Sequence, residues 1–176
     1  MAADSRPDAV VALGLARRAD VDEIAAMSRD LIEDGLQWAW TSRRVAGSVR
    51  RRDALVVVAR ADAALVGFAI MRYGDDDAHL DLLAVLPDHR RHGLGRRLVE
   101  WLEKPALVAG IRAIFLEVRE SNAGARAFYT RLGYRQRDRL TGYYQDLESA
   151  IRMGRDLGAP PAPLPPISVL IPRVED

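Results

Sequence analysis

The stretch LLAVLPDHRRHGLGRRLV, residues 82–99, predicts a strand, a turn at a proline and a helix in immediate succession. Gly93 and Gly95 stand where the helix would begin, and Arg90 and Arg91 come just before them. Glycine lets a ligand approach the backbone closely, and the first N–H groups of a helix have no partner within it. Aligned amides, the helix dipole and nearby arginines together favour an anion. The stretch therefore predicts a cradle for a pyrophosphate group.

The spacing within this stretch disfavours two better-known phosphate loops. A Walker A loop needs Gly-Lys-Ser/Thr, which is absent, and a dinucleotide-binding turn needs GxGxxG, whereas Leu98 occupies the third glycine position. Kinase and dehydrogenase functions are therefore disfavoured. A helix whose arginines are simply solvated stays open as the alternative to a cradle.

Apolar patterns on either side of this stretch predict an α+β fold. Helical spacing covers residues 21–36 and 41–52, the segment after Gly95, which Pro105 should kink or end early, and residues 122–133. Strand patterns cover residues 10–19, 54–59, 64–73, 79–85, 113–118, 134–140 and 147–157. This order predicts a single mixed, mostly antiparallel sheet of about six or seven strands flanked by about four helices.

Length and composition restrict the classes of function. The 176 residues suffice for one domain, and no window approaches the roughly 18 apolar residues of a membrane helix. The first ten residues do not resemble a secretory signal, so a cytoplasmic protein without a membrane partner is expected. The absence of cysteine excludes thiolate chemistry, and the three histidines lack the spacing of a metal site. A net charge of +1 disfavours a dedicated nucleic-acid binder.

A second stretch, FLEVRESNAGARAFYTRLGY at residues 115–134, joins a strand, an asparagine-containing loop and a tyrosine-bearing helix. The two stretches together resemble the GNAT acetyltransferase superfamily, whose acyl-CoA signature Arg/Gln-x-x-Gly-x-Gly/Ala is matched at residues 90–95. The resemblance implies that residues 1–157 form one GNAT domain. Residues 158–176 would then form a proline-rich, extended C-terminal arm.

The resemblance also implies acetyl-CoA as cosubstrate and no metal. Backbone N–H groups near Leu83 and Val85, where the strand bulges in the family, would hold the pantetheine and the acetyl carbonyl. Amides from His92 to Arg96 would hold the pyrophosphate, and Asn122 would contact the pantetheine arm. The full set expected to bind the cofactor is Leu83, Ala84, Val85, Arg90, Arg91, His92, Gly93, Leu94, Gly95, Arg96, Asn122 and Tyr129.

Glu117 and Tyr129 are the catalytic candidates. From the residues alone, Glu117 in its apolar strand either pairs with Arg119 or Arg126 or serves as a base, and Tyr129 is either a core aromatic or a functional phenol. The fragment LEVRESN is similar to the RimI-type branch, which acetylates protein N-terminal amines. That similarity implies Glu117 as general base, acting through water, and Tyr129 as general acid toward the sulfur.

Four residues are expected to bind the acceptor: Trp38, Asp81, Tyr143 and Tyr144. Asp81 is also a second candidate base. The Tyr143–Tyr144 pair resembles one in the RimI-type branch, but ordinary sheet packing is the alternative, as core packing is for Trp38. QWAW at residues 37–40 and the segment 145–150 both depart from the branch. A small-molecule amine, such as a polyamine, an amino acid or an antibiotic, therefore stays open as acceptor.

A catalytically silent acyl-CoA-binding regulatory module is the rival class of function. It would keep the cofactor cradle without turnover. Both a monomer and a homodimer agree with the sequence.

Overall fold

A computed structural model describes residues 10–158 and contains a seven-stranded sheet with the order β1-β2-β3-β4-β5-β7-β6. Neighbouring strands are antiparallel except β4 and β5, which are parallel. The strands are β1 (Val11–Leu15), β2 (Ala54–Ala61), β3 (Ala64–Tyr73), β4 (Asp77–Val85), β5 (Ala113–Arg119), β6 (Arg135–Tyr144) and β7 (Glu148–Asp156). The α-helices are α1 (Val21–Leu31), α2 (Ser42–Arg50), α3 (Leu94–Val108) and α4 (Ala123–Arg131). The predicted fold class is confirmed.

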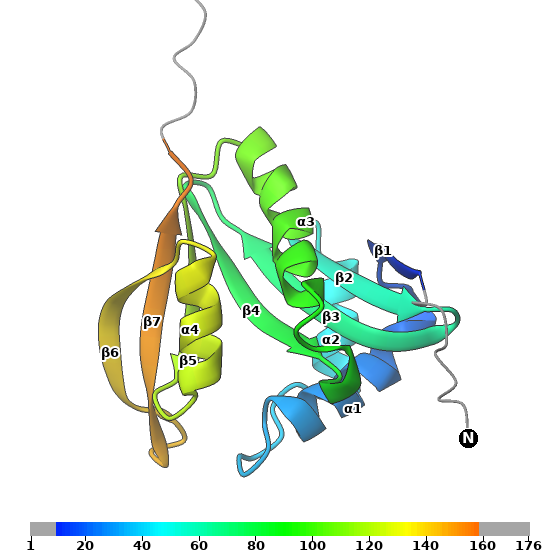
Figure 1. Ribbon diagram of the computed structural model, residues 1–176, viewed down its shortest axis with the longest axis horizontal. Coiled ribbons are helices and arrows are strands. Elements are labelled where there is room, and N and C mark those ends of the chain that lie inside the picture. The colour runs from blue at the N-terminus through cyan, green and yellow to red at the C-terminus, as the bar shows by residue number, and fades with distance from the viewer. Residues whose placement is uncertain (1–9, 159–176) are drawn as a thin grey trace, which may run out of the picture.

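The helices cover the sheet from both sides. In Figure 1, α3 and α4 lie in front of the sheet, and α1 and α2 lie behind it. Each layer has its own buried cluster: Leu98 and Leu102 of α3 belong to one, and Ile24 of α1 and Val45 of α2 belong to the other. The alternating pattern of a strand buried on one face appears in β5, where every second residue is buried.

Two predicted helices have different ends in the structure. The first is α1, which ends at Leu31 instead of residue 36, before Gly35 adopts a positive φ of 76°. The other is α3, which continues past Pro105 to Val108. Pro105 lies in the last turn, where a missing N–H removes a bond close to the helix end, and the prediction of an early end was wrong.

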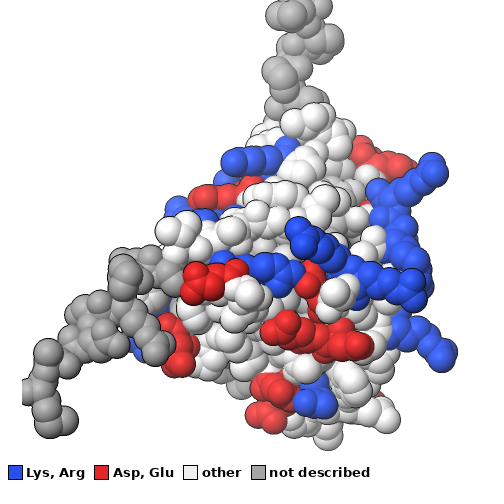
Figure 2. All heavy atoms as spheres, turned by 90° about the vertical axis from the view of Figure 1, so that its right-hand side faces the viewer, with Lys and Arg blue, Asp and Glu red and all other residues white. Residues whose placement is uncertain are grey.

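The described surface carries both signs of charge. In Figure 2, basic side chains gather along one edge of the face shown, and acidic ones are scattered over the rest. Three exposed arginines of α2 are Arg43, Arg44 and Arg50. No helix in residues 10–158 is long and apolar enough to cross a membrane. The proposed C-terminal arm lies outside the described residues, apart from Gly158.

One buried ion pair joins the two halves of the sheet. Both carboxylate oxygens of Glu103, on α3, accept hydrogen bonds at 2.8 Å from the guanidinium of Arg155 on β7. The Tyr134 hydroxyl donates to the same carboxylate at 3.1 Å. Glu103 is buried, while Arg155 is about one third exposed. The contact therefore links α3 to β7, in the other half of the sheet.

We expect Glu103→Ala to lower the free energy of unfolding in urea by about 2–3 kcal/mol. This is below the roughly 3–5 kcal/mol for a fully buried pair, because water can reach Arg155. Glu100→Ala on the same helix is the matched control. Its pair with Arg96 is half exposed, so the expected change is within about 0.5 kcal/mol. Equal effects of the two substitutions would contradict this account.

Candidate functional site

The site lies where β4 and β5 part. Their backbones pair only over Asp77–His79 and Ala113–Phe115, and beyond that point the strands diverge, as Figure 1 shows. Two cavities occupy the opening. The larger, about 670 Å³, extends over the start of α3 to α4, and the smaller, about 130 Å³, lies between the strands. Both are lined by Leu31, Leu83, Asn122, Ala125 and Tyr129, so they adjoin.

A bulge in β4 reverses which positions of the strand point to each face of the sheet. Ile70 pairs with Leu82 and Met71 pairs with Leu80, which leaves Asp81 as the extra residue. Leu80 therefore packs in the α3 cluster, whereas Leu82 packs in the α1–α2 cluster. The family resemblance had implied a bulge near Leu83 and Val85; the structure places it at Asp81.

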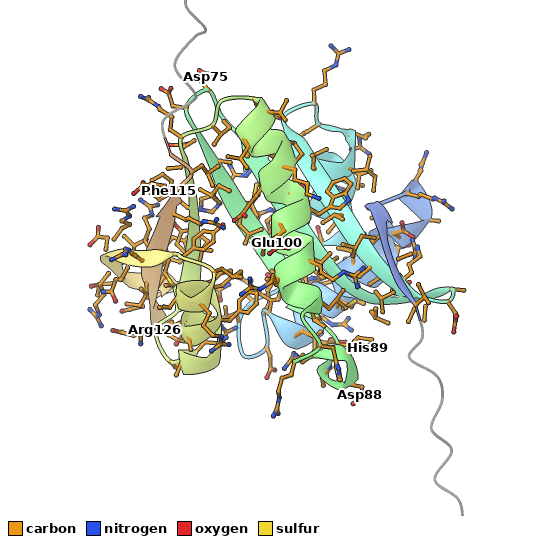
Figure 3. The ribbon with its side chains drawn as sticks, turned by 45° about the horizontal axis from the view of Figure 1, so that its top comes forward. Asp75, Asp88, His89, Glu100, Phe115 and Arg126 are labelled. Atoms are coloured by element: carbon orange, nitrogen blue, oxygen red, sulfur yellow. The ribbon has the colours of Figure 1, made fainter. Side chains whose placement is uncertain are left out.

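The larger cavity collects the residues expected to bind the cofactor. All of them line it except His92. Arg90 donates from Nε to the Val85 carbonyl at 2.9 Å, which fixes the turn before α3. Asp88 and His89 lie in that turn, at the entrance of the helix (Figure 3). The residues lining this cavity from the predicted set are Leu83, Ala84, Val85, Arg90, Arg91, Gly93, Leu94, Gly95, Arg96, Asn122 and Tyr129.

The two glycines of the cradle have different roles. Gly93 precedes the helix with a φ of 75°, a conformation that side chains disfavour, and a Cβ there would meet no atom within 4 Å. A Cβ on Gly95 would lie 3.1 Å from Cζ of Phe128 on α4. The small size of Gly95 thus serves packing between α3 and α4, whereas the space beside Gly93 is open.

Glu117 faces away from α3 and α4, because its neighbours Leu116 and Val118 fill the core on that side. Only 4% of its side chain is exposed. Its Oε2 lies 2.6 Å from Nε2 of His79, and its Oε1 accepts from Nε of Arg152 at 2.8 Å. The predicted ion pairs with Arg119 or Arg126 were wrong.

Those two arginines bind backbone carbonyls. Arg119 donates to the carbonyls of Ile32 and Asp34, at 2.8 Å each, and Arg126 donates to that of Glu120 at 3.3 Å. Arg119 thereby anchors the loop after α1 beside the smaller cavity.

His79 bridges two carboxylates. Its Nδ1 lies 2.8 Å from Oδ1 of Asp81, and Asp81 in turn accepts two hydrogen bonds at 2.6 Å from Arg72. Burial lowers the pKa of His79, but the bonds to Asp81 and Glu117 outweigh it and raise that pKa to about 9. Burial alone would raise the pKa of Glu117, yet the hydrogen bonds from His79 and Arg152 lower it. Glu117 is therefore a carboxylate beside an imidazolium.

Tyr129 and Asn122 stand on the other side of the smaller cavity. Burial raises the pKa of the Tyr129 phenol, so it keeps its proton at neutral pH. Its ring packs edge-on against Phe128 and Tyr134. Asn122 caps α4 by accepting from the Ala125 N–H at 2.9 Å. This bond uses the side-chain oxygen of Asn122 and does not involve its NH₂ group.

The four residues expected at the acceptor side are not all brought together. Asp81 and Tyr144 line the smaller cavity. Tyr143 does not, although its hydroxyl donates to Glu117 at 3.4 Å. Trp38 lines neither cavity; its Nε1 donates to the Trp40 carbonyl at 3.1 Å.

The two segments that depart from the RimI-type pattern touch one another. The N–H of Gln37 donates to the side-chain oxygen of Gln145 at 2.9 Å, and the side-chain amide of Gln145 donates to the Gln37 carbonyl at 3.0 Å. Gln145 and Asp146 form the β6–β7 turn with φ values of 56° and 60°, which are unfavourable outside glycine, asparagine and aspartate. This contact, here termed the glutamine latch, joins the α1–α2 loop to the sheet.

Glu33 organises the same loop and was missed in the sequence. It is buried, and its carboxylate accepts from the N–H groups of Ala39 and Trp40 and from the Ser28 hydroxyl. An acidic residue just after a helix gives no distinctive pattern, so the sequence offered no signal for it. Within residues 10–158, no group of three or more His, Cys, Asp or Glu side chains is arranged to hold a metal ion.

Comparison with known proteins places this chain in a family. Residues 21–134 match the acetyltransferase (GNAT) family. The chain belongs to this family. The resemblance drawn from the two sequence stretches is thereby confirmed, and the parted strands and the start of α3 belong to a GNAT domain.

Individual relatives agree with the family. The chain is 41% identical over 97 residues to an uncharacterized N-acetyltransferase of Methanocaldococcus jannaschii, which covers 54% of this chain and 62% of that protein. It is 42% identical over 96 residues to the ribosomal protein bS18-alanine N-acetyltransferase of Salmonella typhimurium, covering 53% and 65%. The chain thus spans less than two thirds of the length of these curated relatives.

A solved structure extends the likeness over the whole described domain. The ribosomal-protein-S18-alanine N-acetyltransferase from Escherichia coli has a TM-score of 0.72 at 29% sequence identity, and the match covers 89% of this chain and 99% of that chain.

The raised pKa of His79 gives a prediction for stability. Its protonation stabilises the fold fully below the ordinary value of 6.5, and this contribution is lost as the pH rises through about 9. The difference in free energy of unfolding between wild type and His79→Gln should therefore shrink from pH 6.5 to pH 9 in urea titrations. A difference that stays constant over that range would show that the imidazolium does not form.

The glutamine latch should protect the Gln37 amide from hydrogen exchange. In Gln145→Ala we expect that amide to exchange about fivefold faster, since one net hydrogen bond contributes about 1 kcal/mol. Gln136→Ala, an exposed substitution elsewhere on β6, is the control. Unchanged exchange at Gln37 in the first variant would mean that the latch does not hold in solution.

Proposed function

We propose that the protein is an acetyl-CoA-dependent N-acetyltransferase whose acceptor is the α-amino group of a protein or peptide N-terminus. One observation carries the proposal. Tyr129 borders both cavities, whereas Glu117 borders only the smaller one and lies on the opposite face of the sheet. A donor in the larger cavity and an amine from the other face would meet between an acid and a base.

The start of α3 fits an acyl-CoA. The first intrahelical bond runs from the Arg97 N–H to the Gly93 carbonyl, so the N–H groups of Leu94, Gly95 and Arg96 have no earlier helical acceptor. Arginines line the same cavity, and its volume of about 670 Å³ is that of a cofactor site. These groups would hold the pyrophosphate, and acetyl-CoA supplies the acetyl group as a thioester when bound.

Glu117 and Tyr129 account for the two proton transfers. The amine nitrogen forms a bond to the acetyl carbon and must lose a proton, which Glu117 would take through a water molecule. The carbon–sulfur bond breaks, and Tyr129 would donate its phenol proton to the departing thiolate. Because burial keeps Tyr129 protonated, the acid is in the required state at neutral pH.

An α-amine suits this base better than a lysine. An α-amino group has a pKa near 7.7–8.0, so roughly a tenth is neutral at pH 7, against well under a hundredth for lysine with a pKa of about 10.4. Glu117 has a lowered pKa and is a weak base, which favours an acceptor that is already partly neutral. The similarity to enzymes that act on the alanine of a ribosomal protein supports the same class of acceptor.

The test compares peptides that present a free N-terminus with matched peptides that are blocked there but carry lysine. We expect release of free thiol from acetyl-CoA only with the free N-termini. In Glu117→Gln and Tyr129→Phe, kcat/KM should fall by about 10²–10⁴, the usual share of general acid–base catalysis. The Kd for acetyl-CoA should stay within about twofold of wild type in Glu117→Gln, because Glu117 lines only the smaller cavity.

Glu23→Gln, an exposed change on α1, is the control and should keep full activity. If the enzyme acetylates polyamines, amino acids or an antibiotic but none of the peptides, the acceptor is a small-molecule amine and the proposed acceptor is wrong. Binding of acetyl-CoA without turnover of any amine would favour the silent regulatory module.

A further inference from the structure

Five charged side chains form a ladder across four neighbouring strands. It runs from Arg72 on β3 through Asp81 and His79 on β4 to Glu117 on β5 and Arg152 on β7. The contacts lie between 2.6 and 2.8 Å. Only Glu117 has a role in the proposed chemistry as general base, so the rest of the ladder needs its own account.

The ladder stands where the backbone ceases to hold β4 and β5 together. His79 pairs with Phe115 as the last register position of these two strands. The contact of His79 with Glu117 crosses the opening immediately beyond that position. A side-chain bridge therefore continues the connection that the backbone no longer makes.

The geometry selects the doubly protonated ring. Both nitrogens of His79 lie within hydrogen-bond distance of a carboxylate oxygen, and a carboxylate can only accept. A neutral imidazole has one N–H and would place a lone pair against one of the carboxylates. With 28% of the His79 side chain exposed, water screens that repulsion only in part.

We propose that His79, held as an imidazolium by Asp81, is a positioning residue that fixes the Glu117 carboxylate at the smaller cavity and keeps it ionised at acidic pH. The inference rests on the proposed function, because it assumes that Glu117 takes the proton of the amine. Asp81 then orients His79, and Arg72 holds Asp81, so neither of them needs to contact the acceptor.

His79 is the cation that faces Glu117 from β4. The end of α1 and the loop after it present Leu31 and Ile32, which are apolar. The titratable and charged groups near Glu117 or its partner Arg152 are His79 and Asp81 of β4, Arg72 of β3, Arg119 of β5, Arg152 of β7, Tyr129 of α4, and Asp138, Tyr143 and Tyr144 of β6. Asp81 is paired with Arg72, which leaves His79 and Arg152 to offset the charge of Glu117.

The first test is the pH profile of kcat/KM for His79→Gln relative to wild type, with a free N-terminal peptide and acetyl-CoA. The ratio of the two enzymes cancels the ionisation of the peptide amine. We expect the ratio to be constant above about pH 7.5 and to fall toward acidic pH, by up to tenfold per pH unit, because loss of the cation raises the pKa of Glu117. The Kd for acetyl-CoA should be unchanged, and Glu23→Gln, the exposed change on α1, should give a flat ratio.

Each outcome has a separate meaning. A ratio that is low but independent of pH between 5 and 8.5 would reduce His79 to a structural bridge and overturn the inference. If Glu117→Gln retains wild-type turnover, the proposed general base fails instead, whatever His79 does. Asp81→Asn should reproduce the pH-dependent loss more weakly, because it leaves His79 in place but removes its anionic partner.

A second measurement needs no activity and is available if His79→Gln folds poorly. NMR titration of the ring in wild type should show the imidazole proton leaving near pH 9. Glu117→Gln should lower that midpoint by a pH unit or more, since the two groups stabilise each other's charges. The chain has three histidines, and a ring that titrates near the ordinary 6.5 at position 79 would overturn the inference.

Discussion

The structure depends on its parallel strand pair, β4 and β5, whose backbone pairing ends after three register positions. Every other neighbouring pair in the sheet is antiparallel, and β3–β4 and β5–β7 stay paired over most of their lengths. The parting of β4 from β5 therefore leaves an opening inside a continuous sheet, with core clusters intact on both sides. Side chains from both strands can meet there without passing around an edge.

The bulge at Asp81 determines what each face of that opening presents. Before the bulge, β4 directs His79 to the face on which Glu117 lies. After it, Leu83 and Val85 pack toward the α3 cluster, beside the helix start that lines the larger cavity. A strand of strict alternation would keep all of these residues on one face. One extra residue in β4 thus places His79 on the face of Glu117, and Leu83 and Val85 on the face of the larger cavity.

Local patterns in the sequence predicted most of the elements and most of the residues that line the larger cavity. Apolar alternation marked β5, and the glycines and arginines before α3 marked the helix start that lines the larger cavity. The partners of Glu117 were not predictable, because His79 is 38 residues before it and Arg152 is 35 residues after it. Nor does any local pattern reveal which strand will bulge or where a parallel pair ends. Those features follow from the register of the whole sheet.

The glutamine latch is a second contact that the sequence could not predict, and its partners are farther apart in the chain. Gln37 and Gln145 are 108 residues apart, and each lies in a segment that departs from the RimI-type pattern. The unfavourable φ at Gln145 occurs where its side chain satisfies the backbone of the other loop. The two segments that differ from the RimI-type pattern therefore meet in one contact. The contact between the α1–α2 loop and the β6–β7 turn forms only in the folded sheet, so neither segment predicts it by itself.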